Sequence, residues 1–149
     1  MSPMSTIIRR NRSIWKSRMA YLLDTNIISN VMRQPLGNAA NRMRGFRSGD
    51  LLTSVLVQAE VRFGYTKSGV VRQKIAAEAI LQHLRVEDWC APADLAYAAL
   101  RSELEAVGSS MGQIDLLIAA HALVLDAVVV TDDRAFLRVA GLKVENWLL

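Results

Sequence analysis

The sequence predicts an α/β fold with a mostly parallel central sheet of about four to five short strands flanked by helices. Short apolar runs at 21–23, 51–53 and 127–131 alternate with longer helical patterns, and this alternation is typical of a parallel sheet. The run 127–131 is continuous and mostly β-branched, as buried parallel strands are. The segment 111–126 is apolar on nearly every side, which indicates a helix buried against the sheet.

The remaining elements follow from their start and stop signals. The first strand ends at Asp24, cap-type residues open a helix after it, and the turn cluster 34–38 closes that helix. In chain order the further expectations are helix 39–47, strand 51–53, helix 55–67, helix 70–84, an extended segment at 86–90, helix 93–107, helix 111–126, strand 127–131, a short helix 134–139 and an edge strand 143–145. Helical spacing gives helix 70–84 an apolar side made of Ile75, Ala79, Ile80 and Leu84. The last residues, 147–149, are expected to pack onto the core.

Composition bounds the class of protein. The 149 residues, 52% hydrophobic and 21% charged, fit one globular domain. No apolar run approaches the roughly 18 residues of a membrane span. The single Cys90 excludes an intramolecular disulfide framework and fits a reducing compartment, so we expect a cytoplasmic protein, with Cys90 as a small buried residue. One cysteine and two histidines do not support a zinc site of the usual kind.

The positive charge is concentrated at the N-terminus. Residues 1–18 hold five of the 18 basic residues and no acidic residue, so 19–149 holds 13 basic and 14 acidic residues. We predict that 1–18 lies outside the fold and that 19–149 is the domain. Three interpretations of 1–18 stay open: an upstream extension of a chain that naturally begins at Met19, a non-native addition, or a basic arm that touches nucleic acid. The helix 39–47 contains Arg42, Arg44 and Arg47. These arginines form either a solvated face or a patch that guides a polyanion.

Two predicted strands end in acidic residues. Asp24 follows the first strand, and Asp132 and Asp133 follow the strand 127–131. The carboxyl ends of parallel strands face the crevice where ligands bind. Asp24 could equally be a helix N-cap, and if it serves the crevice, Thr25 or Asn26 would take over the cap.

Two predicted helices carry acidic residues in costly places. Glu60 falls on the apolar face of helix 55–67, where a carboxylate needs compensation, although it could also reach Arg62 or another helix. Asp115 lies in the first turn of the buried helix, where it could simply compensate the helix dipole. His121 lies roughly 240° around that helix from Asp115, so we interpret it as a core histidine. The apolar face around Glu60 holds Leu56, Val57, Val61, Phe63 and Gly64.

Four such carboxylates in one α/β domain suggest a common site. Carboxylates brought together repel one another unless a cation neutralises them. An all-oxygen acidic site suits Mg²⁺ or Mn²⁺, and such an ion activates water for attack on a phosphodiester. The sequence offers no Gly-rich phosphate-binding motif and no Ser/His/Asp or Cys/His arrangement that rivals this chemistry.

At these residues the chain resembles the PIN-domain ribonucleases, and among them the VapC toxins of bacterial toxin–antitoxin pairs. The resemblance runs from about Met19 to Leu149, and its four motifs occur in the family's order. The motifs are LLDTNIIS with Asp24, SVLVQAEVRFG with Glu60, GQIDLLIAAHAL with Asp115 and VVVTDDRAF with Asp133, followed by the ending GLKVENWLL.

The resemblance implies a three-layer PIN-like domain that acts as a metal-dependent endoribonuclease toxin. It further implies an RNA substrate, a VapB-type antitoxin partner, a homodimer and a toxin–antitoxin hetero-oligomer. The implied ligands of one or two Mg²⁺ or Mn²⁺ ions, and the catalytic residues, are Asp24, Glu60, Asp115 and Asp133. The residues implied to support them are Asn26, Thr131 and Asp132.

The chain departs from the family pattern at two places. The Asp132-Asp133 doublet leaves the fourth acid open, and we choose Asp133 because the family's usual spacing is Thr-x-Asp. The tail 1–18 is foreign to the family's usual start. Two other functions remain as alternatives. One is a catalytically inactive RNA-binding or regulatory module whose acids only cap helices, and the other is an α/β phosphatase, which would usually want a DxD pair and a later lysine.

Overall fold

The computed structural model describes residues 19–149, and the predicted extension 1–18 lies outside the described residues. At the centre is a five-stranded sheet in the order β3-β2-β1-β4-β5, and all neighbouring strands are parallel. The strands are β1 (Ala20–Leu23), β2 (Leu51–Ser54), β3 (Arg85–Glu87), β4 (Ala127–Val130) and β5 (Val144–Glu145). The predicted α/β fold with a parallel sheet is confirmed.

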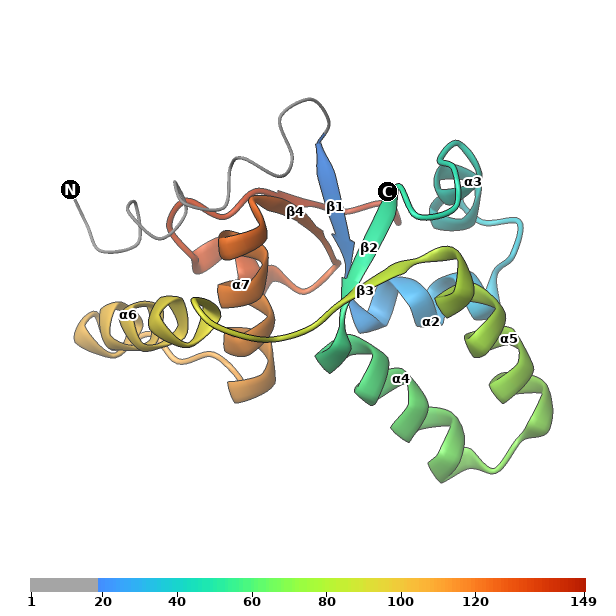
Figure 1. Ribbon diagram of the computed structural model, residues 1–149, viewed down its shortest axis with the longest axis horizontal. Helices are drawn as coiled ribbons and strands as arrows, with labels where there is room; N and C mark the ends of the chain where they lie inside the picture. The colour runs from blue at the N-terminus through green and yellow to red at the C-terminus, as the bar shows by residue number, and fades with distance from the viewer. Residues whose placement is uncertain (1–18) are drawn as a thin grey trace.

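Helices flank the sheet on both sides (Figure 1). Right-handed connections place helices on both faces of the sheet. The chain first moves from β1 to β2 and β3, and then returns past β1 to β4, so the two sets of connecting helices lie on opposite faces. The return connection, α6 and α7, lies on one side, and the outward connections lie on the other, where α4 and α5 form a hairpin beside α2. The helices are α2 (Thr25–Arg33), α3 (Asn38–Arg44), α4 (Val55–Ser68), α5 (Val71–His83), α6 (Ala93–Ala106), α7 (Gln113–Leu125) and the 3₁₀ helix η2 (Arg134–Arg138).

The strand order creates a crevice between β1 and β4. These strands are neighbours, yet the chain leaves β1 in the direction of β2, and such a reversal opens a ligand-sized gap at the carboxyl ends of the strands. The register pairs Leu23 with Val130. Asp24 and Thr131, which follow these two residues in the chain, consequently lie side by side at the carboxyl ends of β1 and β4.

The core is built as the sequence predicts around α7, which contributes eight buried residues. Trp147 is 1% exposed and stacks on Phe46, with ring centroids 5.7 Å apart. The prediction that the whole segment 147–149 packs onto the core is wrong for Leu149, which is exposed. Nowhere in 19–149 is a helix both long enough and apolar enough to cross a membrane.

The apolar face predicted for helix 70–84 is confirmed for Ile80 and Leu84, which pack on the core, and is wrong for Ile75 and Ala79, which are exposed. α5 instead buries Ala77 and Leu81, because it packs on α2 and α4 and its outer side faces solvent. Cys90, expected to be buried, is also exposed, because it lies in the connection that follows β3.

The helix predicted at 39–47 ends earlier, at Arg44, because Gly45 caps it. Its arginines serve local contacts: Arg42 lies over the Trp147 ring, 5.2 Å from its centroid, and Arg44 donates to the Pro35 carbonyl. These contacts favour the solvated-face interpretation over a patch for a polyanion.

Candidate active site

The carboxyl ends of β1 and β4 open on a cavity of about 380 Å³ that is lined by carboxylates. All four predicted acids reach it, from four different segments of the chain. The lining residues are Asp24, Thr25, Asn26, Ser29, Arg33, Glu60, Asp115 and Asp133.

Asp24 is both a helix cap and a cavity residue. Its Oδ1 accepts a 2.8 Å hydrogen bond from the Thr25 amide at the start of α2, and its Oδ2 accepts one of 2.8 Å from the Thr131 hydroxyl. The expectation that Thr25 or Asn26 would take over the cap is wrong, because one carboxylate has oxygens for both tasks. Burial raises the pKa of Asp24, and the charges of Glu60 and Asp133 add to this, while the two hydrogen bonds oppose it.

Thr131 joins the strand ends into one polar network. While its hydroxyl donates to Asp24, its oxygen accepts from the Asn26 side-chain amide at 3.1 Å and from the Asp133 backbone amide at 3.0 Å. The Asn26 carbonyl oxygen in turn accepts from the backbone amide of Asp132 at 3.4 Å. Asn26 and Thr131 thus hold the loop after β4 against α2.

Glu60 reaches the cavity from α4, and its Oε1 accepts a 3.1 Å hydrogen bond from the Thr25 hydroxyl. The apolar face on which the sequence placed it is confirmed only in part. Val57 and Val61 are buried, but Phe63 is 66% exposed and Glu60 itself is half-buried. Arg62 does not compensate Glu60, because its guanidinium pairs with Glu78 on α5, with Nε 3.0 Å from Oε1.

Asp115 lies in the first turn of α7 and is half-buried. Burial, followed by the charges of Asp24 and Asp133, raises its pKa from 3.8 to about 6. A Cβ at Gly112, the residue before the helix, would stand 3.3 Å from the Asp115 Oδ2. The glycine therefore leaves room for this carboxylate at the cavity.

The structure distinguishes the two acids of the doublet. Asp133 lines the cavity, and its Oδ1 caps η2 by accepting a 2.9 Å hydrogen bond from the Ala135 amide. The Asp132 side chain is exposed and is not part of the lining. Asp132 was expected to support the carboxylates, and its one contact with the site residues is the hydrogen bond from its backbone amide to Asn26.

His121 is a core residue, as predicted. It is 2% exposed, its Nδ1 lies 2.9 Å from the Ser54 hydroxyl oxygen, and burial lowers its pKa. It is not among the residues that line the carboxylate cavity.

Sequence reasoning missed two lining residues, Ser29 and Arg33, and gave Thr25 only a capping role. These three residues are spaced by four positions on α2, so they share the face that leads away from Asp24. This spacing in the sequence could have indicated that Ser29 and Arg33 lie on the same side of the helix as Thr25.

The donor set fits a hard divalent cation. Four carboxylates meet at one cavity, and within 19–149 no hydrogen bond or ion pair holds the Asp115 carboxylate. No three His, Cys, Asp or Glu side chains of the described part stand close enough together to chelate an ion unaided. Mg²⁺ suits such a loose arrangement, because it keeps several waters and needs only one or two carboxylates as direct ligands.

Comparisons with known proteins show which family the chain resembles. The family model described as the PIN domain matches residues 21–142. Ribonuclease VapC2 of Rickettsia felis is 34% identical over 132 residues, which cover 87% of this chain and 98% of the relative. The tRNA(fMet)-specific endonuclease VapC of Shigella flexneri is 29% identical over 131 residues, with 87% and 98% covered. A chain in the crystal structure of VapBC2 from Rickettsia felis, bound to a DNA fragment from their promoter, superposes with a TM-score of 0.79 at 31% identity and covers 87% and 99%.

Proposed function

This chain belongs to the PIN-domain family, among the VapC ribonucleases of toxin–antitoxin systems, and we propose that it cuts RNA internally with the help of Mg²⁺ or Mn²⁺. The observation that carries the proposal is the convergence of Asp24, Glu60, Asp115 and Asp133 on one cavity at the carboxyl ends of β1 and β4. Burial and, after it, the charges of Asp24 and Asp133 raise the pKa of Asp115, and a bound cation would relieve the repulsion between these carboxylates.

The four carboxylates differ in how many hydrogen bonds hold each of them in place. Asp24 is fixed by two hydrogen bonds, Glu60 by one from Thr25, and Asp133 by its contact with the first turn of η2. Asp115 is the least restrained. A divalent ion held by these groups would supply the activation of water and the neutralisation of phosphoryl charge. In the hydrolysis, the water oxygen bonds to phosphorus, one P–O ester bond breaks, and the departing oxygen takes up a proton.

The test is RNA cleavage by the full chain with Mg²⁺, with Mn²⁺ or with EDTA. Because one relative is named as specific for tRNA(fMet), initiator tRNA is included beside total RNA. We expect cleavage with either metal, none in EDTA, and a loss of at least about a hundredfold in Asp24→Asn and Asp115→Asn, since each removes a ligand charge.

Asp94→Asn is the matched control, because Asp94 also lies in the first turn of a helix, α6, but is exposed and does not line the carboxylate cavity. It should cleave like the wild type. Equal cleavage by all variants, or cleavage that survives EDTA, would reject the metal mechanism. Binding of RNA without cleavage would favour the inactive RNA-binding module instead.

The proposal includes a VapB-type antitoxin as partner, supported by the VapBC2 complex that contains a chain like this one. An antitoxin that blocks the carboxylate cavity would protect RNA in the same assay. The neighbouring reading frame is the first place to look for its gene. The homodimer implied by the family remains a prediction, to be tested by the mass of the purified chain in solution.

A further inference from the structure

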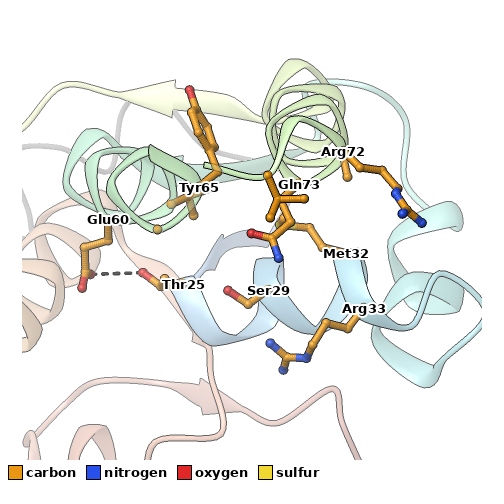
Figure 2. A pocket seen from close by; sticks show the side chains of 12 residues that line it. Thr25, Ser29, Met32, Arg33, Glu60, Tyr65, Arg72 and Gln73 are labelled. Carbon is orange, nitrogen blue, oxygen red and sulfur yellow. Dashed lines mark hydrogen bonds between the residues drawn. The ribbon is translucent and has the colours of Figure 1, made fainter. Parts of the chain in front are cut away.

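A second cavity, of about 560 Å³, continues from the carboxylate cavity along α2. It lies between α2 and the α4–α5 hairpin, and we call it the hairpin groove (Figure 2). Four residues line both cavities: Thr25, Ser29, Arg33 and Glu60. A ligand in the groove would therefore extend directly to the four carboxylates.

Two arginines of the groove, Arg33 and Arg72, make no side-chain hydrogen bond or ion pair with any residue of the described range 19–149. Arg33, at the end of α2, lines both cavities, and Figure 2 shows its side chain running back along the helix on the Ser29 side. Arg72, in the first turn of α5, lines only the groove. By contrast, Arg62 is neutralised by Glu78.

The groove also has apolar and aromatic lining, alongside polar residues such as Ser29 and Gln73, and two helices joined by side-chain contacts form one of its walls (Figure 2). The Tyr65 ring belongs to the lining, while its hydroxyl donates a 2.6 Å hydrogen bond to Glu78 and points away from Ser29 in Figure 2. Glu78 also pairs with Arg62, so both helices of the hairpin are tied together. The apolar lining consists of Met32, Val61, Val70 and Ala76.

We propose that the hairpin groove binds a single-stranded segment of the RNA on one side of the bond that is cut. This inference rests on the proposed function and deepens it. Arg33 contacts the phosphate nearest the carboxylates, Arg72 contacts a phosphate further along, and a base or ribose packs on the apolar lining near Tyr65.

The pattern of charge and apolar surface points to single-stranded RNA. Cations that follow the backbone, with aromatic and apolar surface between them, are how proteins hold single strands. In a duplex the bases are stacked inside and cannot enter a cavity of this size, so the cut strand must be unpaired here. The body of the protein, nearly neutral over 19–149, makes such local cations more important.

The test compares Arg33→Gln and Arg72→Gln with the control Arg47→Gln. The control also removes one positive charge, but Arg47 precedes β2 and so lies at the end of the sheet opposite the carboxylates. Steady-state kinetics use an RNA that the wild type cuts. We expect KM to rise about five- to tenfold in Arg72→Gln with kcat nearly unchanged. In Arg33→Gln we expect KM to rise and kcat to fall, because this residue also borders the carboxylates. Arg47→Gln should match the wild type.

A binding measurement separates charge contacts from folding effects. A fluorescent single-stranded oligoribonucleotide is titrated with Asp115→Asn protein, alone and combined with each arginine change, at several salt concentrations. Replacing either groove arginine should make the slope of log affinity against log salt shallower by about 0.7, the value for one phosphate contact on a single strand. Unfolding in urea, recorded for every variant, identifies any that is misfolded.

The outcomes are distinguishable from failure of the proposed function. If the wild type cuts no RNA in metal, the proposed function fails. If the wild type cuts RNA but both folded arginine variants keep its KM and salt slope, the groove assignment is wrong. Loss of antitoxin binding in these variants, with RNA kinetics unchanged, would also overturn it and would assign the groove to an acidic protein segment.

Discussion

The Thr131 hydroxyl donates a 2.8 Å hydrogen bond to Asp24 Oδ2, and so joins two strand ends that lie 107 residues apart in sequence. Thr131→Val keeps the shape of the side chain and removes this bond together with the acceptor for Asn26 and the Asp133 amide. We expect a loss of about 1–3 kcal/mol in the free energy of unfolding, because buried partners are left unsatisfied. Urea denaturation measures it, and RNA cleavage should fall at least tenfold as Asp24 loses its anchor.

Thr53→Val is the control for this change. Thr53 is fully buried on β2, and its hydroxyl donates a 2.7 Å hydrogen bond to the Leu23 carbonyl rather than to a carboxylate. The variant should be destabilised to a similar degree, yet retain most of its cleavage at a temperature where it is folded. Equal cleavage loss in both variants would mean that Thr131 acts through stability alone.

Asp115→Asn should stabilise the protein at neutral pH in EDTA. The pKa of Asp115 is about 6 in the folded chain against 3.8 for an ordinary aspartate. The folded state binds the proton more tightly, so the stability from this group is present below pH 3.8 and is lost as the pH rises through 6. Because the group is half-exposed, solvent screening reduces the full shift, and we expect a gain of about 1 kcal/mol at pH 7.5.

Urea midpoints between pH 4 and 8 check this expectation, with the wild type declining across that window relative to the variant. Asp94→Asn should follow the wild type or be slightly less stable, since it loses only a helix-dipole contact. Saturating Mg²⁺ should raise the midpoint of the wild type more than that of Asp115→Asn. Parallel pH profiles for wild type and Asp115→Asn would contradict the raised pKa.

The doublet after β4 offers a test between adjacent acids. Asp133→Asn keeps an oxygen to cap η2 at Ala135 but removes the charge from the cavity, so folding should be preserved and cleavage reduced at least tenfold. Asp132→Asn removes the same charge from an exposed side chain. Its cleavage should stay within about threefold of the wild type, as for a screened surface charge. The reverse ranking would assign the fourth acid to Asp132.

The sequence was informative where pattern and burial coincide. The continuous run at β4 and the all-round apolar α7 predict buried elements, and both are buried in the structure. Prediction failed on the α4–α5 hairpin, where Ile75 and Phe63 look like core residues and yet are exposed. Periodicity shows which residues share a face, but it does not show whether another element covers that face.

The same limit applies to the candidate site. Asp24 and Asp133 follow strands, so parallel-sheet geometry alone predicts that they meet. Glu60 was singled out as a carboxylate on an apolar face, yet it is only half-buried, and it reaches the cavity because α4 starts directly after β2. Arg33 was overlooked because a lone arginine at a helix end resembles a favourable contact with the helix dipole.

His121 gives a pH dependence of opposite sign to that of Asp115. Its Nδ1 meets the Ser54 hydroxyl, whose oxygen also caps α4 at the Leu56 amide, and burial depresses the histidine pKa below 6.5. The stability from the neutral ring is present above pH 6.5 and is lost as the pH falls through the folded-state pKa. His121→Asn should cost about 1–3 kcal/mol at pH 7.5, because it leaves a cavity and a weakened hydrogen bond.

That cost should shrink as the pH falls toward 5, because only the wild type then has to protonate a buried ring. Urea midpoints of the two proteins at pH 7.5, 6.5 and 5.5 measure the difference directly. A cost for His121→Asn that stays constant over this range would show that His121 has the same pKa in the folded and unfolded chain, and would refute the depressed pKa.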